Sequence, residues 1–66
     1  MEIQVNGQME HVDDGLTLSD YLKHKKLESE AVVVELNLAI IPKENYPTCN
    51  LNDKDILEIV RFVGGG

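Results

Sequence analysis

The sequence predicts an α+β domain in which a mixed sheet of four to five strands packs on one short helix. Three features support this fold class: an alternating hairpin at the N-terminus, one short amphipathic helical segment, and an alternating strand before the C-terminal glycines. The chain has 66 residues, which is enough for a single core. We therefore expect one domain over residues 1–63 and a flexible glycine tail over 64–66.

The first two strands are predicted by alternation and a turn. Residues 1–5 alternate apolar and polar side chains, which is the period of a strand with one buried face. Asn6 and Gly7 follow, and this dipeptide favours a type I′ turn because both central residues need a positive φ. The return strand is expected over 8–12.

The helix is predicted to begin at Thr17, whose side chain can accept a hydrogen bond from a free backbone N–H. Asp20 then lies in the first turn, where the helix dipole favours a negative charge. Leu18, Tyr21 and Leu22 supply an apolar stripe. The segment is two or three turns long, so packing must hold it.

The second half of the chain contains two prolines that limit its elements. Strands are expected over residues 31–36, 40–41 and 56–63, and one helical turn is expected over 43–46. Pro42 restricts the shortest strand to an edge of the sheet, and Pro47 is expected to stop the helical turn.

The order of these elements favours one topology. The helix joins two strands through a connection long enough for a right-handed crossover, so those strands can be parallel neighbours. If the first and last strands pair in the centre, one mixed sheet cradles one helix, which is the β-grasp architecture. A ferredoxin-like split βαβ unit is the alternative, but it needs a second full helix, and 43–46 is too short for one.

Composition limits the classes of function. The chain has 12 acidic and 6 basic residues and a net charge of −6, which disfavours binding to nucleic acid or anionic lipid. The same charge favours a partner with a basic docking surface. The single cysteine and the lack of a long apolar run or signal segment predict a cytoplasmic protein, and we expect it to be a monomer.

Neither a catalytic site nor a metal site is expected. Such a short chain has no room for a deep cleft, so binding or carrying is favoured over catalysis. Cys49 lies in a predicted loop without a nearby histidine or second cysteine, and is interpreted as an incidental thiol. His11 and His24 lie on different elements, with no further ligands at a recognisable spacing.

The C-terminal glycines are the main candidate site. Gly64 and Gly65 lack Cβ atoms, so they can thread a narrow channel in a partner and bring the carboxylate of Gly66 to chemistry there. A carboxylate is a poor electrophile, and adenylation by ATP would activate it. Attack by sulfide or persulfide would then give a thiocarboxylate, and attack by an amine would give an amide. A frayed terminus or a cloning remnant is the alternative.

The last strand predicts a docking surface beside the tail. Its alternation directs Leu57 toward the helix and places Glu58, Val60 and Phe62 together on the open face of the sheet. Exposed apolar residues rimmed by acids would suit a partner interface. The alternative is that the loop over 43–50 covers this face.

The sequence resembles the ThiS family of sulfur carriers in thiamine biosynthesis. The likeness runs through the whole chain, includes residues 33–37 and 41–44, and is strongest over 55–66, which end in the family's Gly-Gly. Lys43 stands in place of the family's arginine, and Lys54 in place of the glycine of its usual Asp-Gly-Asp turn. Neither departure touches the tail.

The resemblance implies a β-grasp fold and a cycle of activation at Gly66. An adenylating enzyme of the ThiF type, related to the ubiquitin activators, would convert the carboxylate to an acyl-adenylate. Sulfur from a cysteine desulfurase system would replace AMP and leave a 1-thioglycine. Thiazole synthase of the ThiG type would then take the sulfur. ATP belongs to the partner, so the carrier would bind no cofactor and would not be an enzyme.

Three other readings remain open. A related sulfur carrier would serve molybdopterin synthesis or tRNA thiolation. A ubiquitin-like modifier would join Gly66 to a target lysine through an amide bond. A small regulatory or toxin-neutralising domain would carry the glycines without using them.

Overall fold

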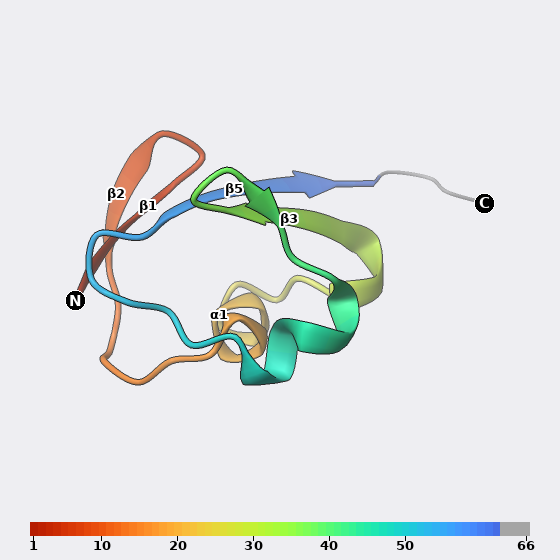
Figure 1. Ribbon diagram of the computed structural model, residues 1–66, viewed down its shortest axis with the longest axis horizontal. Coiled ribbons are helices and arrows are strands. Elements are labelled where there is room, and N and C mark those ends of the chain that lie inside the picture. The colour runs from red at the N-terminus through yellow and green to blue at the C-terminus, as the bar shows by residue number, and fades with distance from the viewer. Residues whose placement is uncertain (63–66) are drawn as a thin grey trace.

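A five-stranded mixed sheet forms one layer of the molecule, and helices form the other (Figure 1). The computed structural model describes residues 1–62. The strands are β1 (Glu2–Val5), β2 (Gln8–His11), β3 (Val32–Leu36), β4 (Ala39–Ile40) and β5 (Ile56–Arg61). The helical elements are the α-helix α1 (Leu18–His24) and two 3₁₀ helices, η1 (Ser29–Ala31) and η2 (Lys43–Thr48).

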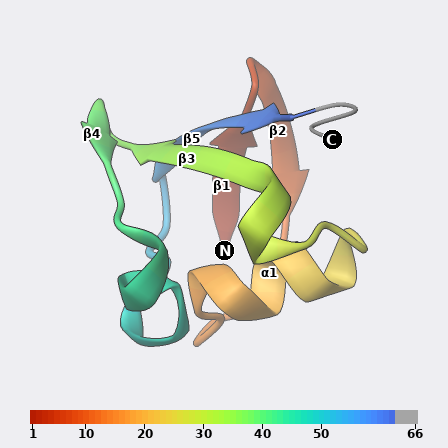
Figure 2. The ribbon, with the colours of Figure 1, turned by 90° about the vertical axis from the view of Figure 1, so that its right-hand side faces the viewer.

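The first and last strands pair in the centre of the sheet, in the order β2-β1-β5-β3-β4 (Figure 2). They run parallel, with Gln4 beside Ile56 and Val5 beside Leu57. The other neighbouring strands are antiparallel. The expected β-grasp architecture is confirmed, and the ferredoxin-like alternative is excluded because α1 is the one α-helix within residues 1–62.

Helix α1 begins where the sequence predicts, because Thr17 caps it. The backbone N–H of Asp20 donates to Oγ1 of Thr17 at 3.1 Å, and the backbone N–H of Thr17 donates to Oδ2 of Asp20 at 3.1 Å. These reciprocal bonds form a capping box, in which an aspartate replaces the usual glutamate. They also lower the pKa of the Asp20 carboxyl from its ordinary value of 3.8.

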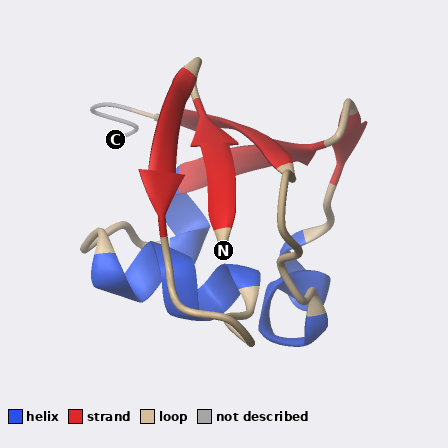
Figure 3. Cartoon of the chain, turned by 90° about the vertical axis from the view of Figure 1, so that its left-hand side faces the viewer, coloured by secondary structure: helices blue, strands red, loops and turns tan. Residues whose placement is uncertain are grey.

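The core lies between the sheet and the helical layer (Figure 3). Its buried members are Ile3, Val5, Leu16, Leu18, Tyr21, Leu22, Val32, Val34, Tyr46, Leu51 and Leu57. Tyr46 is the contribution of η2, and its burial raises the pKa of the phenol. Since η2 packs beside α1 on the core side, the alternative that the loop over 43–50 covers the open face is wrong.

Several expected boundaries differ in the structure. Helix η2 extends to Thr48 and contains Pro47, because the fixed φ of proline lies in the range of a 3₁₀ helix. The short helix η1 was not predicted. Strand β5 ends at Arg61 rather than at residue 63, which lies outside the described residues.

Two polar side chains fix the beginning of β5. The carboxylate of Asp55 accepts bonds from the backbone N–H of Asn52 at 2.7 Å and from Nδ2 of Asn37 at 3.1 Å. Oδ1 of Asn37 accepts the backbone N–H of Ile56 at 2.9 Å. Turn chemistry therefore accounts for buried Asp55, as expected, whereas the role of Asn37 was not apparent from the sequence.

Candidate functional site

Strand β5 has one buried face and one exposed face, and the predicted docking residues lie on the exposed face. Leu57 is 0% exposed and Ile59 is partly buried against the core. Val60 and Phe62 are 58% and 55% exposed. The expected orientation of these side chains is confirmed, whereas their role in docking remains a prediction. We refer to Glu58, Val60 and Phe62 as the docking patch.

The neighbouring strand extends the docking patch. In the antiparallel pairing of β3 with β5, Val33 lies opposite Val60, and Glu35 lies opposite Glu58. Residues directly opposite each other on one face have Cβ atoms about 5 Å apart, so their side chains interact. An apolar pair therefore lies next to an acidic pair on the open face of the sheet.

The acidic pair is unfavourable in the isolated chain. Like charges directly opposite each other on a sheet are destabilising. Within residues 1–62, neither Glu35 nor Glu58 has an ion-pair partner. A basic side chain of a partner would relieve the repulsion on binding, and would thereby add orientation to an apolar contact.

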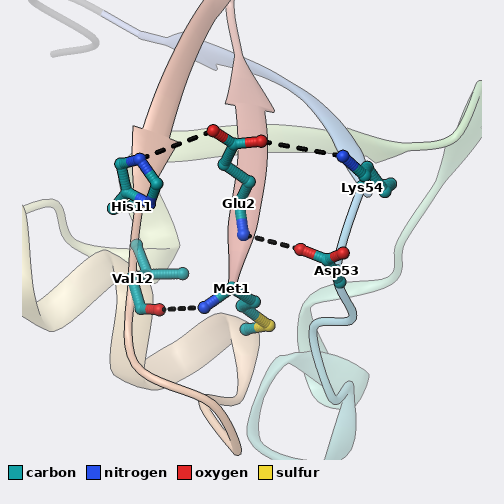
Figure 4. A network of polar contacts seen from close by, with 6 residues as sticks. All are labelled: Met1, Glu2, His11, Val12, Asp53 and Lys54. Carbon is teal, nitrogen blue, oxygen red and sulfur yellow. Dashed lines mark hydrogen bonds and ion pairs between the residues drawn. The ribbon is translucent and has the colours of Figure 1, made fainter.

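The opposite end of the open face is polar and internally paired (Figure 4). The carboxylate of Glu2 lies between Nε2 of His11 at 3.4 Å and Nζ of Lys54 at 3.7 Å. The backbone N–H of Glu2 donates to Oδ1 of Asp53 at 2.7 Å. The open face therefore has paired charges near the N-terminus, and its exposed apolar residues include Met9 and Ile56 besides Val60 and Phe62.

Three of the predicted site residues, Gly64, Gly65 and Gly66, lie outside the described residues. The structure does place the residue two positions before them. The backbone N–H of Phe62 donates to the carbonyl oxygen of Ala31 at 2.8 Å, so pairing with the β3 side continues past the end of β5. The docking patch is thus connected to the glycines by Val63 alone.

Cys49 has the environment of a structural thiol. It is partly buried against the core, and its backbone carbonyl accepts the N–H of Leu18 at 2.8 Å. Burial raises the pKa of the thiol, and the nearby carboxylate of Asp55 raises it further. Since the thiolate is the nucleophilic form, these effects disfavour a catalytic role.

A hollow of about 290 Å³ lies between β2 and α1, on the core side of the sheet. Its polar centre is already paired: Tyr21 donates to Oε1 of Glu10 at 2.8 Å, and Nζ of Lys25 lies 3.1 Å from the same oxygen. Burial and the bond to Glu10 raise the pKa of Tyr21. These contacts tie α1 to β2 and leave the docking patch as the better candidate interface.

Two further kinds of site were sought in the described part of the chain. Residues 1–62 contain no cluster of three or more histidine, cysteine or acidic side chains able to hold a metal ion. No helix in that range is long and apolar enough to cross a membrane. The cytoplasmic location and the monomeric state remain predictions.

Comparison with known proteins, by sequence and by structure, identifies one family. The model of the ThiS family matches residues 3–66. The sulfur carrier protein ThiS of Bacillus subtilis is 45% identical over 65 residues, covering 97% of this chain and 98% of that protein. The crystal structure of ThiS from Geobacter metallireducens superposes with a TM-score of 0.85 at 33% identity, and both chains are covered completely.

A much larger relative contains a similar segment. The thiazole synthase of Paramagnetospirillum magneticum is 39% identical over 66 residues. The match covers 100% of this chain but 20% of the relative, so the chain spans a fifth of that protein's length.

Proposed function

Because the chain belongs to the ThiS family, we propose that it carries sulfur on the carboxyl group of Gly66 for the thiazole ring of thiamine. The observation that carries the proposal is the position of the docking patch, whose last residue, Phe62, precedes Gly64 by two positions in the sequence. Val60 and Phe62 are exposed on an uncovered face at the end of β5. An enzyme that holds the docking patch would therefore have the terminal carboxylate within reach.

The proposed chemistry takes place on the tail. Attack of a carboxylate oxygen of Gly66 on ATP releases pyrophosphate and forms an acyl-adenylate. Sulfide then attacks the carbonyl carbon, AMP leaves, and a C–S bond replaces a C–O bond without electron transfer. If the donor is a persulfide, the attack leaves an acyl disulfide, which a thiol reduces to the thiocarboxylate.

The chain acts as the substrate of its partners in this proposal. The raised pKa of Cys49 and the paired state of Glu10 and Tyr21 support this, because neither group is poised for catalysis. An adenylating enzyme of the ThiF type would supply the ATP site, and a cysteine desulfurase system would supply the sulfur. The resulting 1-thioglycine is a modification of Gly66 rather than a bound cofactor.

We further propose that thiazole synthase takes the sulfur. Support comes from the P. magneticum thiazole synthase, which contains a segment similar to this entire chain. A carrier and an acceptor that act on one another can be joined in one polypeptide, which raises their effective concentration.

Intact-mass measurement tests the proposed function. The protein is incubated with ATP, the cognate adenylating enzyme and a sulfur donor, and exchange of oxygen for sulfur is expected to raise its mass by about 16 Da. Matched controls omit ATP, or use a chain that lacks Gly65 and Gly66, and should show no gain. Absence of the gain in the intact chain would refute the proposal. Attachment of the chain to other proteins would favour a modifier instead.

A further inference from the structure

The side chain of Asn6 binds the backbone of β5 although it belongs to the turn between β1 and β2. Its Oδ1 accepts the N–H of Ile59 at 2.7 Å, and its Nδ2 donates to the carbonyl oxygen of the same residue at 3.2 Å. Asn6 adopts a φ of 48°, as the first central residue of the type I′ turn requires. The turn thus aims a peptide-like amide at the last strand.

This amide takes the place of a further residue of β1. Strand β1 pairs with β5 at Gln4 and Val5 only, and the backbone N–H of Asn6 then donates to the carbonyl oxygen of Leu57 at 2.9 Å. The chain turns away at that point. A carboxamide offers one acceptor and a donor in the arrangement of a peptide group, so it continues the ladder by one step, to Ile59.

The second half of β5 therefore depends on Asn6 for its contact on the β1 side. Within residues 1–62, no backbone group of β1, of β2 or of the turn between them bonds to β5 beyond Leu57. On the other side, β3 remains paired as far as Arg61, and Phe62 bonds to Ala31. Without the amide this half would become a two-stranded ribbon, and such ribbons twist more than wider sheets.

We propose that Asn6 is a positioning residue that sets the orientation of the docking patch. The proposal rests on the proposed function, since it concerns how the activating enzyme binds the carrier. In this proposal Asn6 acts through other residues and not by direct contact with the partner. It acts through Ile59, the neighbour of Val60 in β5.

Asn6→Gly separates the amide from the turn. Glycine accepts a positive φ at least as readily as asparagine, so the turn is retained and only the side-chain bonds are lost. Asn37→Gly is the matched control, because Asn37 has a φ of 51° and its amide binds Ile56, at the start of the same strand.

Two measurements report on the amide. In Asn6→Gly, hydrogen exchange at the N–H of Ile59 should accelerate about tenfold, the scale of one lost hydrogen bond, while Asn37→Gly leaves it unchanged. The KM of the adenylating enzyme for the carrier should rise roughly threefold to tenfold in Asn6→Gly with kcat nearly constant, as expected when binding is lost equally in the ground state and transition state. A loss of stability alone would not raise KM in a protein that is still folded.

Asn6→Asp provides a second variant if Asn6→Gly folds poorly. Aspartate keeps the acceptor for the N–H of Ile59 and replaces the donor by an oxygen that faces a carbonyl, so KM should again rise. A wild-type KM in either folded variant would overturn the proposal, and so would an equal rise in Asn37→Gly. Failure of the wild-type chain to be activated, read in the same assay, would overturn the proposed function and this inference with it. A normal wild-type reaction with unaffected variants would overturn this inference alone.

Discussion

The two faces of β5 have opposite environments although they share one backbone. On the core face, Leu57 is completely buried and Ile59 packs against the core. On the open face, Val60 and Phe62 remain more than half exposed, and Glu58 lies opposite Glu35. The side-chain period of a strand thus places stabilising contacts and candidate binding contacts at alternate positions. Substitutions on the two faces should therefore separate stability from partner binding.

The core face should give the largest effect on stability. Leu57→Ala is expected to lower the free energy of unfolding by about 3 kcal/mol, because it removes apolar surface and leaves a cavity in the core. Val60→Ala is the matched change on the open face, and should cost less than about 0.5 kcal/mol. Urea denaturation followed by circular dichroism measures both. Equal losses in the two variants would contradict the division between the faces.

The open face should give the largest effect on binding. Phe62→Asp should fold normally yet weaken binding to the adenylating enzyme about 30-fold, since buried aromatic anchors at interfaces contribute about 2 kcal/mol. Isothermal titration calorimetry gives the dissociation constants.

Met9→Asp is the control for this substitution. Met9 is 55% exposed, as Phe62 is, and it lies on the same face but on β2, opposite Gln4. Its replacement should leave the affinity unchanged. If both variants bind equally weakly, the whole open face rather than the docking patch contacts the partner; if a folded Phe62→Asp protein binds normally, the docking patch has no role.

A smaller effect is expected at the turn before β5, where a substitution should change the stability of the protein but not its affinity for the partner. Lys54 has a φ of 74°, a conformation that is costly for residues with a Cβ atom. Lys54→Gly should raise the free energy of unfolding by about 0.5–1 kcal/mol, after allowing for the entropy of glycine and the exposed ion pair with Glu2. Lys54→Ala loses the same ion pair but keeps the strain, so it should not be more stable than the wild type. Unchanged binding in both variants would sharpen the contrast with Phe62.

Local patterns predicted much of the fold because they report on which face is buried. Alternation identified the orientation of Leu57, Val60 and Phe62, and the Asn-Gly pair identified the first turn. These features depend on short stretches of chain, so the sequence alone is sufficient to predict them. The central pairing of the first and last strands is long-range, and it entered the prediction as a condition of the β-grasp topology. The strands that the helix joins, β2 and β3, were expected as possible neighbours, but β1 and β5 lie between them.

Long-range side-chain contacts could not be predicted in the same way. The amides of Asn6 and Asn37 bind Ile59 and Ile56, which lie 53 and 19 residues away in the sequence. Each bond depends on which strand lies beside which turn, and turn propensity alone explains both asparagines equally well. The capping box at Thr17 was missed in part for another reason, since its partner is an aspartate rather than the usual glutamate.

The smallest expected effect lies on the helix that covers the core face, and it depends on pH. Hydrogen bonds from Thr17 lower the pKa of Asp20 below 3.8, so the folded state binds this proton less readily than the unfolded state. The carboxylate therefore stabilises the protein fully above that value, and the stabilisation is lost as pH falls through the lowered pKa of the folded state. Asp20→Asn should reduce the free energy of unfolding at about pH 7, and the difference from the wild type should shrink toward about pH 3. A difference that is constant or grows in acid would contradict this assignment. Because Asp20 lies on α1, away from the open face, Asp20→Asn should leave partner binding at neutral pH unaffected. The pH dependence should therefore concern stability and not binding.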